Sequence, residues 1–132
     1  NYTTSYDPIG DAHTIKTPMP PLLRQHFSLL LINSIAYCVG GESDNQTGGI
    51  EQSINYSYDY VANSWTTSWV NFPATKSGAQ SCAISGKGYI TGGLENNSDS
   101  LHTWEYTPDT WIQKADCLLR IYGEDQGVSG TP

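Results

Sequence analysis

The sequence contains little charge, and most of that charge is negative. Charged residues make up 14% of the 132 residues, and six Lys and Arg face 13 Asp and Glu, so the formal net charge is −7. Binding to the phosphates of nucleic acid, or to an anionic membrane surface, requires a basic face. We therefore expect neither a nucleic-acid partner nor binding to a membrane surface.

The sequence also lacks a long apolar run. The longest run, Leu29–Ile32, has the length of one strand. It falls far short of the roughly 20 residues of a membrane-spanning helix, so we predict no membrane insertion. The chain starts without a methionine and without a signal peptide. This start indicates that Asn1 is a mature terminus or an excised boundary.

Cysteine is scarce, with Cys38, Cys82 and Cys117 spaced 44 and 35 residues apart. No CxxC pair is present, so a zinc or iron–sulfur site has no support. Because the number of cysteines is odd, at most one internal disulfide forms and one thiol is left over. We expect these cysteines to be buried apolar residues.

Recognisable catalytic patterns are missing as well. The sequence has no Ser/His/Asp pattern, no carboxylate pair, no P-loop and no GxGxxG. Its histidines, His13, His26 and His102, do not share a spacing typical of metal ligands. We therefore predict no catalytic residue, no metal site and no cofactor.

Glycine and aromatic residues are plentiful. The chain has 13 Gly and is 11% aromatic, and it is rich in Ser, Thr and Asn. A coiled coil or helical bundle needs Ala, Leu, Glu and Lys in quantity, and a disordered chain lacks aromatic and β-branched residues. The composition predicts an all-β chain of short strands and tight turns, forming one domain or a piece of one.

The strongest signal is an internal repeat. Residues 24–41 align with residues 76–93 at a constant offset of 52, and a tyrosine and a tryptophan further on recur at offsets of 48 and 46. A partial copy, beginning at Tyr6, leads the chain. The landmarks are Arg24, Tyr37, Gly40, Gly41, Tyr58 and Trp65 in the first full copy, and Lys76, Tyr89, Gly92, Gly93, Tyr106 and Trp111 in the second.

Each copy reads as four strands. In the first copy we expect strands at about His26–Ile32, Ile35–Val39 and Ile54–Tyr60, with Trp65 in the fourth. Residues 54–60 alternate between apolar and polar side chains, which is typical of a half-buried antiparallel strand. A four-stranded antiparallel sheet that repeats every 45–50 residues or so indicates the blades of a β-propeller.

In these landmarks the sequence resembles the kelch repeat. That family's pattern is a basic residue, an apolar strand, a glycine pair, and then a tyrosine and a tryptophan. Among kelch-type repeats, those of secreted bacterial proteins resemble this sequence most. The resemblance implies that the glycine pair lies at the crowded centre, where positive φ is needed, and that Tyr and Trp fill the wedge between blades. Two departures stand out: Lys76 replaces the usual Arg, and His13 stands where a Trp is expected.

The repeat divides the chain into four parts. Residues 1–21 form a partial blade of third and fourth strands, residues 22–73 and 74–119 form two blades, and residues 120–132 form a tail or the first strand of a further blade. Two blades do not close a propeller, which has about four to eight. The chain is therefore a fragment of a longer propeller, a subunit of an oligomeric ring or a subunit of a filament.

Two polar loops after the glycine pairs are the candidate binding sites. Because both loops follow equivalent strands, we expect them to open on the same face and to bind a protein, sugar hydroxyls or Ca²⁺. Among the aromatic residues, Trp69 is the one that we most expect to be exposed at the surface. The candidate residues are Glu42, Asp44, Asn45, Trp69, Glu95, Asn96 and Asp99.

Four glycosylation sequons exceed the one or two expected by chance. They predict accessible N-glycosylation sites, and hence an extracellular or cell-surface protein. The acceptor residues are Asn1, Asn45, Asn55 and Asn96.

The leading functional hypothesis is a non-enzymatic binding or assembly module whose partner is protein, in a larger propeller or a repeating surface filament. One alternative is a carbohydrate-binding lectin that closes its ring by oligomerisation. The kelch resemblance adds a fragment of an enzyme, since such propellers include a copper oxidase and a sialic-acid isomerising enzyme. No pair of residues aligns with the Tyr–Cys cross-link of that oxidase. A further alternative is an intracellular adaptor protein.

Overall fold

A computed structural model describes residues 3–20, 24–43, 49–67, 70–107 and 109–119, with the backbone alone at Arg24. Every regular element within these ranges is a β-strand. Accordingly, the described part contains no helix long and apolar enough to cross a membrane. The predicted tail, residues 120–132, lies outside the described residues.

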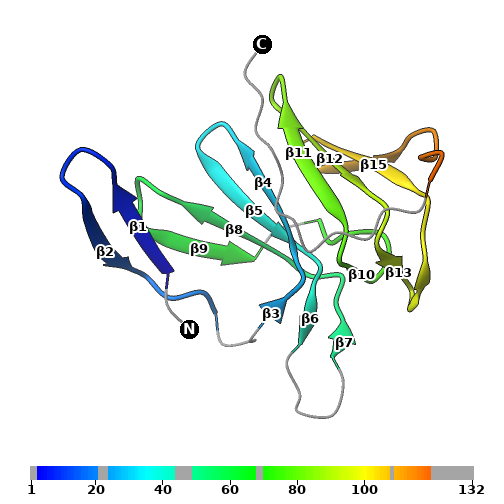
Figure 1. Cartoon of the computed structure of the whole chain (residues 1–132), viewed down its shortest axis with the longest axis horizontal. Helices are drawn as coiled ribbons and strands as arrows, with labels where there is room; N and C mark the ends of the chain where they lie inside the picture. Colours follow the sequence, from blue (N-terminus) through cyan, green and yellow to red (C-terminus); the bar gives the residue numbers. More distant parts are fainter. Residues whose placement is uncertain (1–2, 21–23, 44–48, 68–69, 108, 120–132) are drawn as a thin grey trace.

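Three antiparallel sheets lie side by side like a fan (Figure 1). The N-terminal hairpin pairs β1 (Thr3–Asp7) with β2 (Ala12–Lys16). The main sheet of the first blade has the order β4 (Ser28–Ile32), β5 (Ile35–Val39), β8 (Asn55–Asp59) and β9 (Ser64–Thr67). The main sheet of the second blade has the order β11 (Gln80–Ile84), β12 (Lys87–Thr91), β15 (Thr103–Thr107) and β16 (Thr110–Gln113).

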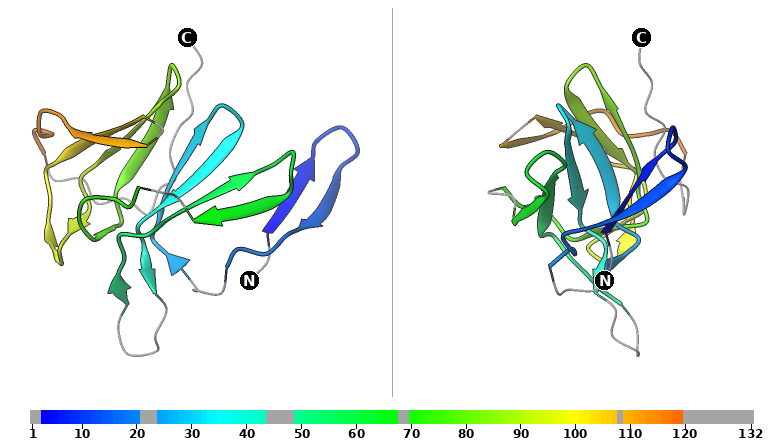
Figure 2. Two further views of the ribbon diagram at one scale, coloured as in Figure 1. Left: turned by 180° about the vertical axis from the view of Figure 1, so that it is seen from behind. Right: turned by 90° about the vertical axis from the view of Figure 1, so that its left-hand side faces the viewer.

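Each blade continues beyond a bend into a smaller three-stranded sheet. The first small sheet has the order β3 (Arg24–Gln25), β6 (Glu42–Ser43) and β7 (Ile50–Glu51), and the second has β10 (Lys76–Ser77), β13 (Leu94–Glu95) and β14 (Ser98–Asp99). Seen from behind, both small sheets extend away from the turns of the main sheets (Figure 2).

These small sheets correct two expectations from the sequence. The predicted strand His26–Ile32 is interrupted, because His26 has a φ of 55° and breaks the extended backbone between β3 and β4. The two predicted loops after the glycine pairs are not open connectors: β6 pairs with β7 and β13 pairs with β14. Backbone pairing makes these loops hairpins with defined orientation.

The glycine pairs sit at the bends because no side chain fits there. Gly40 has a φ of 65°, and a Cβ on it would lie 2.3 Å from the backbone oxygen of Lys76. At the equivalent bend of the second blade, Gly93 has a φ of 69°, and its Cβ would lie 2.4 Å from the backbone oxygen of Ser77. Both the left-handed backbone and the close approach therefore require glycine.

The core lies between the two main sheets. Leu30, Ile32 and Val39 of the first blade meet Ile90 and Tyr106 of the second, and all five are at most 2% exposed. The sheets approach so closely at β12 that a Cβ on Gly88 would lie 2.5 Å from Leu30 Cδ1. Packing between neighbouring blades thus supplies most of the described core.

An aromatic pair recurs at the same register in all three sheets. In each sheet the tyrosine of the next-to-last strand lies directly opposite the ring on the last strand. The ring centroids are 5.0 Å apart in Tyr6–His13, 4.9 Å in Tyr58–Trp65 and 4.7 Å in Tyr106–Trp111, with interplanar angles of 37°, 40° and 37°. His13 therefore occupies the position of the expected tryptophan, and the repeat seen in the sequence is a repeat in space.

The fold class predicted from the sequence is confirmed. The chain is all-β and consists of propeller blades, two of them with four-stranded antiparallel sheets and one N-terminal partial blade.

Replacing Leu30 by Ala tests the packing between blades. Leu30 is 0% exposed, so Leu30→Ala leaves a cavity against Gly88 and should lower the free energy of unfolding by about 2–5 kcal/mol. Leu31 on the same strand is 59% exposed and points to the other face, so Leu31→Ala should change it by less than about 1 kcal/mol. Urea denaturation followed by tryptophan fluorescence measures both. Equal losses in the two variants would contradict this account of the core.

Candidate functional site

The two hairpins beyond the glycine pairs contact each other. Gly41 N donates to Lys76 O at 2.7 Å, and Lys76 N donates to Gln52 O at 3.1 Å. Asn97 N, at the tip of the β13–β14 hairpin, donates to Glu51 Oε2 at 2.8 Å. We call these two hairpins, residues 42–51 and 94–99, the paired hairpins. The predicted binding loops therefore do lie together, at the end of the sheets opposite the β4–β5 turn (Figures 1 and 2).

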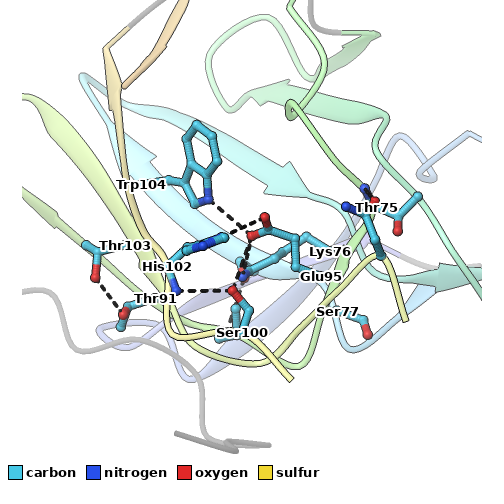
Figure 3. A network of polar contacts seen from close by, with 12 residues as sticks. Thr75, Lys76, Ser77, Thr91, Glu95, Ser100, His102, Thr103 and Trp104 are labelled. Carbon is cyan, nitrogen blue, oxygen red and sulfur yellow. Dashed lines mark hydrogen bonds and ion pairs between the residues drawn. The ribbon is translucent and has the colours of Figure 1, made fainter. Parts of the chain in front are cut away.

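A buried lysine lies beneath the paired hairpins (Figure 3). Lys76 is 1% exposed, and its Nζ lies 3.0 Å from Glu95 Oε2. The same carboxylate accepts hydrogen bonds from Trp104 Nε1 at 3.1 Å and Ser100 Oγ at 3.4 Å. Its other oxygen lies 2.9 Å from His102 Nδ1. We call these five residues the Lys76 network. The ammonium sits in low-dielectric surroundings and needs this carboxylate to remain charged.

The electrostatics of the network follow from this geometry. Burial raises the pKa of Glu95, but hydrogen bonds from His102, Lys76 and Trp104 lower it by more, so it lies below the ordinary value for a glutamate. Burial lowers the pKa of Lys76, and the attraction of Glu95 offsets part of that effect. Glu95 is therefore ionised at neutral pH and acts as the counterion of Lys76.

A second buried carboxylate joins the two blades. Glu51 of β7 is 6% exposed and accepts hydrogen bonds from Thr75 Oγ1 at 2.8 Å and Ser77 Oγ at 3.0 Å, both in the second blade. Together with the hydrogen bond from Asn97 N, these contacts of Glu51 hold Thr75, Ser77 and the tip of the β13–β14 hairpin against the first blade. The sequence alone did not reveal this residue, since its polar neighbours in the chain suggested an exposed loop.

The structure divides the candidate binding residues into four groups. Glu95 was expected in a solvent-exposed loop, but its carboxylate is buried in the Lys76 network and is not available to a ligand. Glu42 is half-buried, with Oε2 3.6 Å from His26 Nδ1. Asn96 and Asp99 are exposed at the tip of the β13–β14 hairpin. The other three, Asp44, Asn45 and Trp69, lie outside the described residues.

One predicted glycosylation site is wrong. Asn55 is only 2% exposed, and its Nδ2 atom, where a glycan would attach, donates to Val70 O at 2.8 Å. The alternation of β8 placed Asn55 on the polar face, but the segment following β9 covers that face. Asn96 is exposed, whereas Asn1 and Asn45 lie outside the described residues.

The outer face of the second blade carries a further charge cluster that the sequence did not reveal. Glu105 is 5% exposed, and its carboxylate lies 3.0 Å from Lys87 Nζ, 3.0 Å from Tyr89 Oη and 3.5 Å from Lys114 Nζ. Hydrogen bonds from Lys87 and Tyr89 hold the pKa of Glu105 below its usual range. Tyr37, which corresponds to Tyr89 in the repeat, instead packs edge-on against Tyr106, with ring centroids 5.2 Å apart.

Comparison with known proteins finds matches among kelch-repeat proteins. No family model matches the chain. Kelch domain-containing protein 3 of Bos taurus is 25% identical over 114 residues, which cover 82% of this chain and 29% of that protein. Alpha-scruin of Limulus polyphemus is 35% identical over 71 residues, which cover 54% of this chain and 7% of that protein. The chain is thus similar to kelch-repeat proteins, as its landmark residues indicated.

A solved structure agrees at the level of the fold. The structure of YjhT superposes with a TM-score of 0.76 and 17% sequence identity, and the match covers 89% of this chain and 45% of that chain. The chain thus spans less than a third of the curated kelch relatives it matches and less than half of YjhT.

Removing the counterion tests the Lys76 network. Glu95→Gln leaves the buried ammonium without a charge partner and should lower the free energy of unfolding by about 3–5 kcal/mol. Asp99 lies on the same hairpin but is exposed, so Asp99→Asn should change it by less than about 0.5 kcal/mol. Thermal and urea denaturation measure both variants. The double variant Lys76→Met/Glu95→Gln should recover much of the loss, and no recovery would speak against an electrostatic origin.

Proposed function

We propose that this chain is a non-enzymatic, protein-binding kelch module whose contact surface is the tip of the β13–β14 hairpin, residues 96–99. The observation that carries the proposal is the contrast within the β13–β14 hairpin. Its base is fixed by the buried Glu95 and Lys76, while its tip, residues 96–99, is exposed. Binding residues are commonly found on loops that a rigid scaffold positions.

The fixed base of the β13–β14 hairpin favours a higher affinity for a partner. Partner binding is opposed by the entropy lost when a mobile loop becomes ordered. Here Glu51, Glu95 and the backbone pairs of the strands already hold the β13–β14 hairpin in one position. The kelch-repeat relatives are consistent with protein interaction as the general role. An extracellular location is also part of the proposal, supported by the exposed sequon at Asn96.

Site-specific photo-cross-linking tests this proposal. Benzoylphenylalanine placed at the exposed Ser98 of the hairpin tip should give protein adducts from an extract of the source cells or from their medium. The matched control carries the same group at Asp116, which is exposed but outside both hairpins. Adducts formed only from position 98 support the hairpin surface, and adducts from the medium support the location. Equal labelling from both positions, or none, would overturn it. Binding to a glycan array that needs the hairpin tip would favour the lectin alternative instead.

A second proposal, self-assembly, rests on the outer faces of the two blades. Ile84 and Ile112 on the outer face of the second blade are 49% and 45% exposed, and Leu29 and Leu31 on the opposite side of the first blade are 41% and 59% exposed. Within a propeller such faces are covered by neighbouring sheets. We propose that copies of this chain cover one another's outer faces.

Native mass measures this assembly. Light scattering on a size-exclusion column should give a species of a few times 14.4 kDa. Ile112→Lys should shift the equilibrium toward the monomer, since a charge would be buried at the contact. Ile9→Lys is the control, because Ile9 is 97% exposed in the turn of the N-terminal hairpin. A monodisperse 14.4 kDa monomer at all concentrations would overturn self-assembly, and a polydisperse large species sensitive to Ile112→Lys would indicate a filament.

A further inference from the structure

A cleft of about 260 Å³ lies between the two blades, away from the paired hairpins. We call it the interblade cleft. Its lining includes two carboxylates, two phenols and two aliphatic hydroxyls, from Asp59, Asp109, Tyr37, Tyr106, Ser57 and Thr66. The first blade contributes most of the lining, and the second contributes Tyr106 of β15 and Asp109 of the β15–β16 turn.

The register explains why the sheets separate here. Tyr37, Ser57 and Thr66 are direct neighbours across β5, β8 and β9, on the face that also carries the buried Leu30. Next to Leu30 the two sheets are in contact, but Ser57 and Thr66 are too small to fill the space beneath Tyr106. A recess lined by polar groups is the result.

The charge in this cleft is not compensated within the described chain. The described lysines are engaged elsewhere: Lys76 pairs with Glu95, and Lys87 and Lys114 pair with Glu105. The fourth, Lys16, lies over the ring of Tyr60, 5.0 Å from its centroid. Neither Asp59 nor Asp109 takes part in any of the ion pairs among the described residues. The cleft therefore favours a cation from outside.

The phenols add to this preference. Burial, then the neighbouring Tyr106 and the charge of Asp109, raise the pKa of Tyr37, so its phenol stays protonated at neutral pH. Aromatic rings beside carboxylates favour guanidinium and ammonium groups, which pair with the carboxylates and pack on the rings.

The repeat supplies an internal precedent. In the second blade the positions equivalent to Tyr37 and Ser57 are Tyr89 and Glu105, again direct neighbours across two strands. There a lysine of the same chain, Lys87, places its ammonium 3.0 Å from the carboxylate, beside the phenol. The first blade has Ser57 at the position of Glu105 and Ile35 at the position of Lys87, so both members of that ion pair are replaced, and the carboxylates beside Tyr37 are those of Asp59 and Asp109.

We propose that the interblade cleft binds a lysine or arginine side chain of a protein partner. This inference rests on the proposed protein-binding function and adds a second contact, chemically distinct from the hairpin tip. Asp59 and Asp109 contact the cationic group, and the half-buried Tyr37 packs against it. Asp59 Oδ1 also accepts hydrogen bonds from the backbone nitrogens of Val61 and Ala62, which fixes its carboxylate at the rim.

Titration with small basic probes tests the cleft by NMR. The methylamides of Nα-acetyl-arginine and Nα-acetyl-lysine should shift the aromatic resonances of Tyr37 and Tyr106 saturably at low salt. The neutral methylamide of Nα-acetyl-norleucine should not. Asp109→Asn should weaken the binding of the basic probes about two- to fivefold, as expected for one partly exposed charge pair. Asparagine tolerates the φ of 72° at this position, and Asp116→Asn is the matched control.

Several outcomes would overturn the inference. These are the absence of shifts at Tyr37 and Tyr106, equal binding of the neutral probe, equal effects of Asp109→Asn and Asp116→Asn, or the same shifts from calcium chloride at lower concentration. Any of them leaves the cross-linking test at Ser98 unaffected. Conversely, if the basic probes bind but position 98 gives no cross-links, the cleft is supported and the hairpin surface is rejected.

Discussion

The contact between the first glycine pair and the backbone of Lys76 sets the geometry on which the rest of the structure depends. Gly41 N donates to Lys76 O, and Gly40 leaves room for that oxygen by having no side chain. The contact fixes the distance between the two blades at the bend. Lys76 is thereby held in the interior, where its ammonium needs Glu95, its direct neighbour in the second blade. Glu51 of the first blade in turn holds the tip of the β13–β14 hairpin, so the bend places a buried ion pair beside an exposed surface.

The repeat made the blades predictable from the sequence, because its landmarks have purely local consequences. A glycine pair produces a bend, and an alternating strand produces a buried face. A tyrosine and a tryptophan across a tight turn produce a stacked pair, even where His13 takes the place of tryptophan. These properties depend on residues within one blade. The strands and their buried faces could therefore be inferred from the spacing of the landmarks.

The buried carboxylates could not be predicted in this way, because their surroundings come from the other blade or from distant strands. Glu51 is bonded to Asn97, 46 residues away in the chain, and Glu95 is bonded to Lys76 across 19 residues. In sequence both glutamates lie in polar segments that resemble solvated loops. The predicted glycosylation site at Asn55 was wrong for a similar reason. The alternation of β8 gave the correct face for its side chain, but it did not show that Val70 lies against that side chain.

The comparison between the two blades also separates architecture from function. Residues that recur in both, such as the glycine pairs and the Tyr–Trp pairs, are fully used by the fold and are poor candidates for recognition. Recognition is better sought where equivalent positions differ. Glu105 with Lys87 closes the outer face of one blade, while Ser57 with Ile35 leaves a recess in the other. Since the backbone is the same in both blades, the chemistry of that recess follows from the side chains alone. The recess is acidic through Asp59 and Asp109, which take part in none of the ion pairs among the described residues, so the cation that would neutralise them comes from a partner.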